Sequence, residues 1–469
     1  MTLQLRNSQQ VALAKLCEPG RTFAALWAEP RSGKTAVSLR WLQHIKPKVA
    51  MVVGPKAAEA VWRAEAAKWL SIKYRFFPLT AGNAYPDLSR IVHAGLTILF
   101  VNYEQFGKAP YKRLKPFLDK VSKLIDGGGA MLLDESHTIK TPSSVFGRHI
   151  RPLAAKWKYR LIITGTPVTS PTQIDAVYGQ WTFLDPDIRQ RWATARDFRE
   201  YFGEWSTVKG FPELIRPIRQ YELNAYIQGN VVTMTGAADP VPIKKATYAV
   251  PQNVLLAQKL MLKNGVLKYH NGKFQKYKDE LPGLDIIGLN PLTRLLRMRT
   301  IVAGWAKDDE GNSFTVREAA AARLKALRKV LRKTDHKVVI AATHLHEIRQ
   351  IRRMLKRQGT PYLVITGKTA DKNRVIEWFQ RGDFKVLLVQ PRTVAMAVDI
   401  SVANDLIWYT SDFNYVTFKQ ASDRIKLSPN SPTVWFLCGR GTVDEDVWKT
   451  LQEDHAHLRK VVKRIKSQA

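Results

Sequence analysis

The sequence predicts an α/β protein built from two parallel-sheet lobes with an irregular basic insert between them. Short apolar runs rich in β-branched residues alternate with helical patterns in the first part of the chain, and this alternation resumes at Thr315. Between these parts Pro and Gly are frequent and the helical periodicity is broken. Strands that alternate with helices are typical of a parallel sheet covered on both faces. We therefore expect an N-terminal lobe at 1–204, the insert at 205–314 and a C-terminal lobe at 315–469.

The strands of each lobe are expected where a short apolar run is followed by a turn and a helical pattern. In the N-terminal lobe these runs are Phe23–Trp27, Val49–Val53, Thr97–Asn102, Ala130–Leu133 and Arg160–Thr164. In the C-terminal lobe they are Lys337–Ala341, Tyr362–Ile365, Lys385–Val389, Asp405–Tyr409 and Thr433–Leu437. After them, the basic amphipathic pattern of Leu451–Lys466 predicts a C-terminal helix.

The insert is expected to contain two hairpins. One has Asn271-Gly272 between two runs of strand-forming residues, which is the strongest short-range hairpin signal. The other surrounds Asp308–Asn312. The first hairpin alternates cations with aromatic rings, so Lys273 and Lys276 are candidates for phosphate contacts. The alternative is a solvated hairpin whose rings pack on the lobe beneath it.

The composition limits the class of partner and the compartment. Lys and Arg number 74 against 40 Asp and Glu, so the formal charge of +34 favours a polyanion such as nucleic acid over a protein that is merely kept soluble. An apolar fraction of 45 % excludes disorder as the main state. No apolar run approaches the roughly 20 residues of a membrane-spanning helix, so no membrane partner is expected. The two cysteines exclude a disulfide framework and favour a reducing compartment.

A phosphate-binding loop is expected at Ala28–Thr35. The segment reads Ala-Glu-Pro-Arg-Ser-Gly-Lys-Thr and lies between an expected strand and an expected helix. This placement directs backbone N–H groups and the helix N-terminus at the phosphates of a nucleotide. Lys34 would neutralise the β- and γ-phosphates, and the Thr35 hydroxyl would bind Mg²⁺. Ala28 stands where such a loop usually begins with glycine, so the prediction rests on the strand–loop–helix context.

Two adjacent carboxylates, Asp134 and Glu135, follow the expected strand Ala130–Leu133. The carboxyl ends of the strands are where α/β sheets bind their ligands. Asp134 would hold Mg²⁺ through its water shell, and Glu135 would orient and deprotonate the attacking water. The alternative, a cap for the following helix, is weakened by the Gly-Lys-Thr loop upstream.

The order of these segments resembles that of superfamily-two helicases, and within them the Swi/Snf-like ATPases. In the N-terminal lobe the resemblance is carried by Leu5–Gln9, Val52–Lys56 with Trp62, Asn102–Gln105, Asp134–Ser144 and Leu161–Pro167. In the C-terminal lobe it is carried by Lys337–Ile340, Thr366–Lys368, Gln420–Arg424 and Gly441–Glu445. The resemblance covers nearly the whole chain apart from the insert. It implies two RecA-like lobes that open and close around ATP and Mg²⁺.

The resemblance also implies roles for single residues, with Gln9 reading the adenine edge and Arg424 acting as an arginine finger from the C-terminal lobe. The catalytic residues would be Lys34, Asp134, Glu135 and Arg424. The residues that bind the nucleotide would be Gln9, Ser32, Gly33, Lys34, Thr35 and Asp134, of which Thr35 and Asp134 also hold the metal. The residues that contact nucleic acid would be Pro55, Lys56, Tyr103 and Thr166, together with Lys273 and Lys276 of the insert.

We expect an ATP-dependent DNA helicase or translocase that moves along or remodels duplex, forked or single-stranded DNA. A monomer in the cytoplasm of a bacterial or phage-infected cell is expected. The Thr-Gly-Thr-Pro form of Thr164–Pro167 favours DNA over RNA, and RNA stays the alternative. A second alternative is a nucleic-acid-binding scaffold with a weakened ATPase. It is suggested by Leu427, where the family has a second arginine, and by Ala395 and Ala397, where it has glycines.

Overall fold

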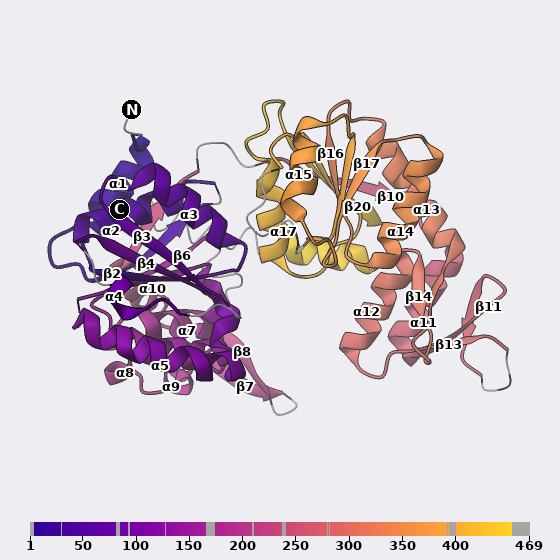
Figure 1. Ribbon diagram of the computed structural model, residues 1–469. Helices are drawn as coiled ribbons and strands as arrows, with labels where there is room; N and C mark the ends of the chain where they lie inside the picture. Colours follow the sequence, from indigo (N-terminus) through magenta and orange to yellow (C-terminus); the bar gives the residue numbers. More distant parts are fainter. Residues whose placement is uncertain are drawn as a thin grey trace. The chain divides into compact units, whose positions relative to one another are not determined.

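The computed structural model divides the chain into two compact units, with the division between residues 237 and 238. The described residues are 4–29, 31–80, 85–91, 94–126, 128–165, 174–208, 211–236, 241–278, 280, 282–391, 393 and 400–452. Each unit contains one large parallel sheet with helices on both faces (Figure 1). The predicted α/β class with two parallel-sheet lobes is therefore confirmed.

Seven strands form the sheet of the first unit: β1 (Phe23–Ala28), β2 (Val49–Gly54), β3 (Tyr74–Leu79), β4 (Leu96–Asn102), β5 (Ala130–Asp134), β6 (Tyr159–Thr164) and β9 (Val231–Met234). Their order is β3-β4-β2-β5-β6-β1-β9, and every neighbouring pair is parallel. The strands predicted from the sequence are confirmed. The two that were not predicted, β3 and β9, lie at the edges of the sheet and are only partly buried, so they lack the continuous apolar run of a central strand.

Two layers of helices enclose this sheet (Figure 1). They are α1 (Asn7–Leu16), α2 (Lys34–Ile45) and α3 (Ala58–Trp69) on one face, and α5 (Lys108–Ile125), α6 (Val145–Ala154), α7 (Ile174–Leu184), α9 (Ala195–Phe202) and α10 (Gln220–Gln228) on the other. Alternate residues of β1 pack on different layers: Ala24 and Leu26 on the first, Ala25 and Trp27 on the second. This alternation holds the end of β1 between the two layers. The shorter elements of the unit are α4 (Leu88–Ile91), η1 (Tyr103–Phe106), η2 (Ser136–Ile139), α8 (Ile188–Arg191), β7 (Gly203–Val208) and β8 (Phe211–Pro217).

Six strands form the sheet of the second unit: β10 (Ile243–Tyr248), β16 (Val338–Ala341), β17 (Tyr362–Ile365), β18 (Val386–Val389), β19 (Asp405–Trp408) and β20 (Thr433–Gly439). Their order is β10-β20-β19-β16-β18-β17, again with every pair parallel. Helices α13 (Arg317–Leu331) and α14 (Leu345–Arg357) pack on one face of this sheet. Helices α15 (Lys372–Arg381) and α17 (Tyr415–Ser422) lie on the other face, and α17 leads into η3 (Asp423–Ile425) (Figure 1). The strands predicted here are confirmed, and β10 was not predicted.

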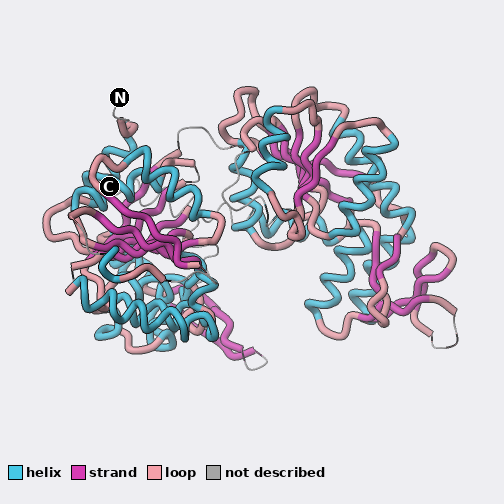
Figure 2. The backbone as a smooth tube through the Cα atoms, viewed as in Figure 1, coloured by secondary structure: helices cyan, strands magenta, loops and turns pink. Residues whose placement is uncertain are grey.

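A smaller substructure of helices and antiparallel strands belongs to the second unit (Figure 2). Its elements are α11 (Gln252–Asn264), β11 (Val266–His270), β12 (Lys273–Lys276), β13 (Leu284–Ile287), α12 (Pro291–Val302), β14 (Trp305–Lys307) and β15 (Ser313–Thr315). Both predicted hairpins are confirmed, as β11–β12 and β14–β15. The first turns at Asn271 and Gly272, whose φ angles of 46° and 81° are those of the tight turn that an Asn-Gly pair favours. The third strand, β13, was not predicted.

The insert is shorter than the sequence boundaries at 204 and 314 indicate. Residues up to 236 complete the first unit, because β9 pairs with β1. Residues 243–248 form β10, which pairs with β20 in the second sheet. The insert therefore extends from α11 to β15. Of the predicted C-terminal helix, the residues from 453 onward lie outside the described part of the chain. No helix among the described residues is both long enough and apolar enough to cross a membrane.

Candidate active site

The loop between β1 and α2 is held in a shape that only glycine permits at its last position. Gly33 precedes α2 with a φ of 84°, in the left-handed region that favours glycine. A Cβ atom at Gly33 would lie 2.1 Å from Nε2 of Gln9. The loop therefore turns sharply and delivers Lys34 as the first residue of α2. The first backbone N–H groups of a helix have no partner within the helix itself, so the N-terminus of α2 suits an anion such as phosphate.

Gln9 lies against this loop, as its predicted role requires. Its Nε2 donates to the carbonyl oxygen of Ser32 at 2.9 Å, and the Arg6 guanidinium donates to the same oxygen at 2.6 Å. The backbone N–H of Arg6 donates to Gln9 Oε1 at 2.8 Å, and Gln9 is only 4 % exposed. In this arrangement Gln9 supports the loop. Its contact with adenine stays a prediction.

Lys34 meets both predicted carboxylates. Its Nζ donates to Glu135 Oε1 at 2.5 Å and lies 3.4 Å from Asp134 Oδ1. The strands before these residues, β1 and β5, are separated in the sheet by β6 alone, so the long lysine side chain spans one strand. Glu135 has a left-handed φ of 54°, an uncommon conformation for this residue type. The structure thus brings Lys34, Asp134 and Glu135 together at the carboxyl edge of the sheet.

The charge of Lys34 governs the ionisation of Glu135. Burial alone would raise the pKa of Glu135, but the charge of Lys34 and the hydrogen bond from His137 outweigh it and hold this pKa well below the usual carboxyl value. His137 Nδ1 lies 3.4 Å from Glu135 Oε2 and 3.4 Å from Thr164 Oγ1 at the end of β6. Glu135 is therefore ionised when Lys34 is beside it.

The remaining polar atoms of the site fit a metal-bound nucleotide. Among the described residues, the buried atoms Asp134 Oδ1 and Ser32 Oγ have no hydrogen-bond partner. Buried polar atoms in proteins are nearly always paired, so both atoms are suited to an additional ligand. Carboxylate and hydroxyl oxygens are the donors that Mg²⁺ takes from proteins, with substrate phosphates completing its shell. Asp134 with Thr35 at the start of α2 is thus a suitable donor set for Mg²⁺.

Two family models match the chain, and one of them spans all the site residues from Ser32 to Thr164. The SNF2-related domain model matches residues 25–246, and the helicase conserved C-terminal domain model matches residues 322–426. The chain belongs to the Swi/Snf-like ATPases of helicase superfamily two. This membership supports ATP hydrolysis as the activity of the site and two RecA-like lobes as the fold.

Other Swi/Snf-like ATPases are similar over much of this chain. An ISWI chromatin-remodelling complex ATPase of Saccharomyces cerevisiae is 22 % identical over 423 residues, covering 84 % of this chain and 34 % of that protein. A chromodomain-helicase-DNA-binding protein 1-like of Mus musculus is 24 % identical over 334 residues, covering 68 % of this chain and 35 % of that protein. This chain therefore spans about a third of the length of these relatives. The solved Sulfolobus solfataricus SWI2/SNF2 ATPase core in complex with dsDNA covers 96 % of this chain and 91 % of its own, with 18 % identity and a TM-score of 0.42.

The residues predicted to contact nucleic acid in this Swi/Snf-like ATPase differ in accessibility. Lys56 is exposed and, with Pro55, follows the end of β2. Tyr103 is 3 % exposed, and its hydroxyl donates to the backbone carbonyl of Asp134 at 2.9 Å. The prediction that Tyr103 grips a strand therefore needs correction, because its side chain is buried behind the carboxylate pair. Thr166 lies outside the described residues.

Two lysines and two rings of the insert hairpin lie in different environments. Lys273 and Lys276 are exposed on β12. The Phe274 ring is 3 % exposed and packs 4.8 Å from the ring of Tyr269, which in turn stacks on Phe314. The Tyr269 and Phe274 rings therefore belong to a hydrophobic cluster of the insert, whereas the alternative interpretation placed the rings on the lobe beneath the hairpin. The two lysines stay candidates for phosphate contacts.

The predicted finger residue of the second unit lies in η3, directly after α17. Arg424 is partly buried, and its neighbour Asp423 accepts a hydrogen bond from Lys419 at 2.5 Å. Leu427 is 45 % exposed, so the residue at the position of the expected second arginine faces solvent. Ala395 and Ala397 lie outside the described residues.

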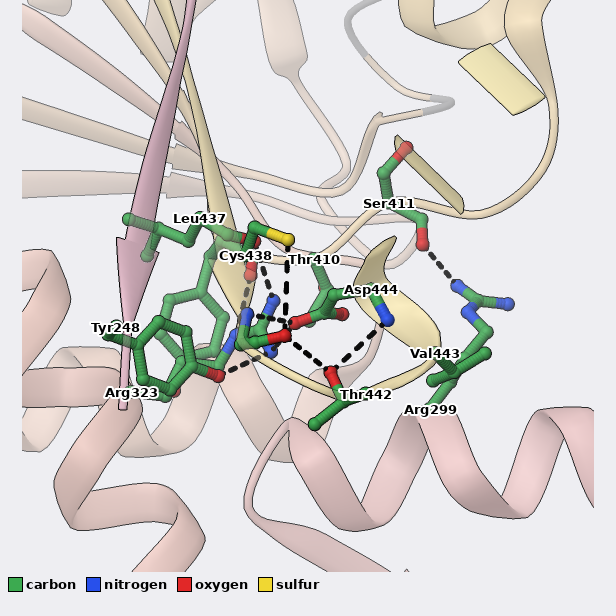
Figure 3. Close-up of polar contacts among 12 residues, drawn as sticks. Tyr248, Arg299, Arg323, Thr410, Ser411, Leu437, Cys438, Thr442, Val443 and Asp444 are labelled. Atoms are coloured by element: carbon green, nitrogen blue, oxygen red, sulfur yellow. Dashed lines mark hydrogen bonds and ion pairs between the residues drawn. The ribbon is translucent and has the colours of Figure 1, made fainter. Parts of the chain in front are cut away.

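A buried arginine that the sequence analysis missed supports the second lobe of this ATPase (Figure 3). Arg323 of α13 is 1 % exposed and donates to Asp444 Oδ2 at 2.8 Å and to the Tyr248 hydroxyl at 2.9 Å. It also donates to the backbone carbonyls of Tyr409 and Leu437. Burial lowers the pKa of Arg323, but the charge of Asp444 more than reverses this effect. The only sequence signal was the match of Gly441–Glu445 to the family, which did not reveal the partner of Asp444.

Proposed function

We propose that this chain hydrolyses ATP and uses the reaction to move along or remodel DNA. The observation that carries the proposal is the contact of Lys34 with both Asp134 and Glu135 at the carboxyl edge of the first sheet. A lysine at a helix N-terminus suits triphosphate binding, and two carboxylates beside it suit metal binding and water activation.

The proposed roles follow from the charges of the site. Phosphate oxygens would draw Lys34 away from Glu135, and the pKa of Glu135 would then rise toward a value better suited to accept a proton from water. Thr35 and Asp134 would hold Mg²⁺, which when bound neutralises phosphate charge. Arg424 of the second unit would act as the arginine finger and stabilise the charge of the transition state.

DNA is the proposed polyanion because the formal charge is +34 and Lys56 is exposed at the β2–α3 turn. Pro55, Lys273 and Lys276 are proposed as further contacts, and Thr166 keeps the role that the family resemblance implies. Strand separation, as opposed to translocation alone, is a finer proposal that requires a wedge, and the insert hairpin is its candidate. We also propose a monomer that works in the cytoplasm of a bacterial or phage-infected cell.

The test is ATP hydrolysis by the wild type and by Glu135→Gln, with single-stranded, duplex and forked DNA and with duplex RNA. We expect DNA to stimulate the wild type and Glu135→Gln to lower turnover by about 100-fold or more, because the base that accepts the proton is lost. ATP binding should persist in the variant, because Lys34 is unchanged. The matched control is Glu18→Gln, which removes an exposed carboxylate paired with Arg21 in the same unit.

The outcomes separate the proposal from its alternatives. If the wild type binds nucleic acid but hydrolyses no ATP with any of the DNA or RNA substrates, the chain is a nucleic-acid-binding scaffold and not an ATPase. If RNA stimulates ATP hydrolysis and DNA does not, the nucleic-acid substrate is RNA and not DNA. Equal turnover of wild type and Glu135→Gln would remove Glu135 from the mechanism.

A further inference from the structure

Trp62 connects the candidate metal-binding carboxylate to the turn that we expect to contact nucleic acid. Its indole Nε1–H donates to Asp134 Oδ2 at 2.9 Å, across 72 residues of sequence. Both side chains are buried, Trp62 at 1 % and Asp134 at 5 % exposure. We propose that Trp62 is a positioning residue: it fixes the Asp134 carboxylate for the metal and transmits displacement of the Pro55–Lys56 turn to it. The inference rests on the proposed function and extends it.

The two oxygens of Asp134 have different surroundings. Oδ2 is bound by the indole N–H, whereas Oδ1 has no hydrogen-bond partner among the described residues and lies 3.4 Å from Lys34 Nζ. A carboxylate can turn about its last torsion angle unless a donor holds one oxygen. The Trp62 bond therefore selects which oxygen faces the phosphate loop. Donors of this kind orient metal ligands and commonly change metal affinity by about 10- to 100-fold when they are removed.

The segment from Lys56 to Trp62 is short and continuous in structure. β2 ends at Gly54, and the next residues turn directly into α3, with the Ala58 N–H donating to the Pro55 carbonyl at 2.8 Å. Trp62 lies on the second turn of this helix. The end of β2 also packs on the site, since a Cβ atom at Gly54 would lie 3.4 Å from Asp134 Cβ. One turn and the start of α3 thus join Lys56 to the indole that holds Asp134, and a displacement of Lys56 would reach the indole along this segment.

The rival explanation is that Trp62 serves only as a core residue whose N–H needs a partner. Trp41 is the matched control for that explanation. It is also 1 % exposed, belongs to the same hydrophobic cluster, and donates through Nε1 to the Leu16 carbonyl at 3.2 Å. Trp41 makes no hydrogen bond to the carboxylates. A merely structural role predicts the same consequences for the loss of either indole N–H.

The experiment measures Mn²⁺ binding by electron paramagnetic resonance in the full chain, with a nonhydrolysable ATP analogue and with or without duplex DNA. Trp62→Phe removes the N–H, and benzothienylalanine introduced at position 62 removes it while keeping the shape of the indole. We expect either change to weaken Mn²⁺ binding by about 10-fold or more. DNA should tighten Mn²⁺ binding of the wild type by about fivefold or more, and this effect should be lost in both variants. Trp41→Phe should behave as the wild type, at a comparable thermal stability.

Two outcomes would overturn the inference. If both position-62 variants bind Mn²⁺ within about twofold of the wild type, Trp62 does not position Asp134. If they bind Mn²⁺ weakly but respond to DNA as the wild type does, the link to the Pro55–Lys56 turn is wrong. Both outcomes are distinct from failure of the proposed function, which would appear as a wild type that hydrolyses no ATP.

Discussion

At the scale of single residues, the charged side chains of the site are paired with one another. Lys34 compensates two carboxylates that would otherwise repel each other in a buried place, and Glu135 is ionised for that reason. Phosphate oxygens would attract the same lysine. Under the proposed function, nucleotide binding and activation of Glu135 would be coupled through this one side chain. A strongly acidic Glu135 before binding would then be compatible with a general base after it.

A second residue gives a pH-dependent stability. His346 Nε2 lies 3.0 Å from Thr315 Oγ1, and the ring stacks 5.5 Å from that of Trp305. Burial and the charges of Arg349 and Arg353 lower the pKa of His346, against the opposing charge of Glu347. Nδ1 is buried with no hydrogen-bond partner among the described residues, so a proton there has no acceptor.

The sign of this effect follows from proton uptake. As pH falls below about 6.5, the unfolded chain protonates His346, whereas the folded chain protonates it only at a lower pH, so the free energy of unfolding decreases. We expect His346→Gln to flatten the pH dependence of unfolding of the second unit between about pH 7.5 and 5.5, as measured by calorimetry. His336→Gln, at an exposed position, should leave the wild-type dependence unchanged. An unchanged slope in His346→Gln would assign the pH dependence to other groups.

At the scale of elements, the sequence predicted the strands whose positions are determined by short-range patterns. Central strands such as β2 and β5 are buried along their whole length, so their apolar runs are unambiguous. Lys34, Asp134 and Glu135 were predicted together because the ends of parallel strands meet at one sheet edge. The edge strands β3 and β9 and the strand β10 were missed, because partly exposed strands have a weaker pattern.

Side-chain partners across the fold were beyond the reach of sequence patterns. The bonds of Trp62 to Asp134 and of Arg323 to Asp444 join residues far apart in the chain. Tyr103 was predicted to contact nucleic acid because Asn102–Gln105 resembles a segment of the family that does so, but its hydroxyl turns inward to Asp134. These hydrogen-bond partners depend on which side chains tertiary packing brings together, and the local spacing of residues in the sequence does not encode them.

At the scale of elements, we predict that the β11–β12 hairpin contributes to DNA binding through Lys273 and Lys276. We expect the double charge reversal Lys273→Glu with Lys276→Glu to weaken DNA binding and to reduce the salt dependence of binding. If both lysines contact phosphates, the slope of log K against log salt should fall by about 1.8, since each phosphate contact contributes about 0.9. Fluorescence anisotropy with labelled duplex DNA at several salt concentrations measures this slope.

The control for the hairpin changes the same number of charges elsewhere in the second unit. Lys325 and Lys329 are exposed on α13, and their joint reversal to Glu removes as much positive charge. A similar loss of affinity in both double variants would mean that only the overall charge matters. A loss confined to the hairpin variant would identify β12 as a contact surface.

At the scale of the whole molecule, binding and hydrolysis of ATP are expected to have different requirements. The residues around the phosphate loop all lie in the first unit, which has its own hydrophobic clusters on both faces of its sheet. Arg424 lies in the second unit, which has separate clusters in its sheet and its insert. The first unit alone should therefore bind the nucleotide, whereas hydrolysis should need both.

This division predicts two thermal transitions in calorimetry of the full chain. ATP analogue with Mg²⁺ at about 100 times its Kd should stabilise the first unit by about 2.7 kcal/mol and raise only its transition. Lys34→Ala should abolish that shift, whereas Arg424→Ala should keep it and lose hydrolysis. Arg323→Lys identifies the other transition, because an ammonium group cannot reproduce the hydrogen bonds that the guanidinium makes to Asp444, Tyr248 and two backbone carbonyls, and their loss should lower the second transition alone. If the analogue raised the transition that Arg323→Lys lowers, the nucleotide would be bound by the second unit, and the assignment of Lys34 and Asp134 as its ligands would be wrong.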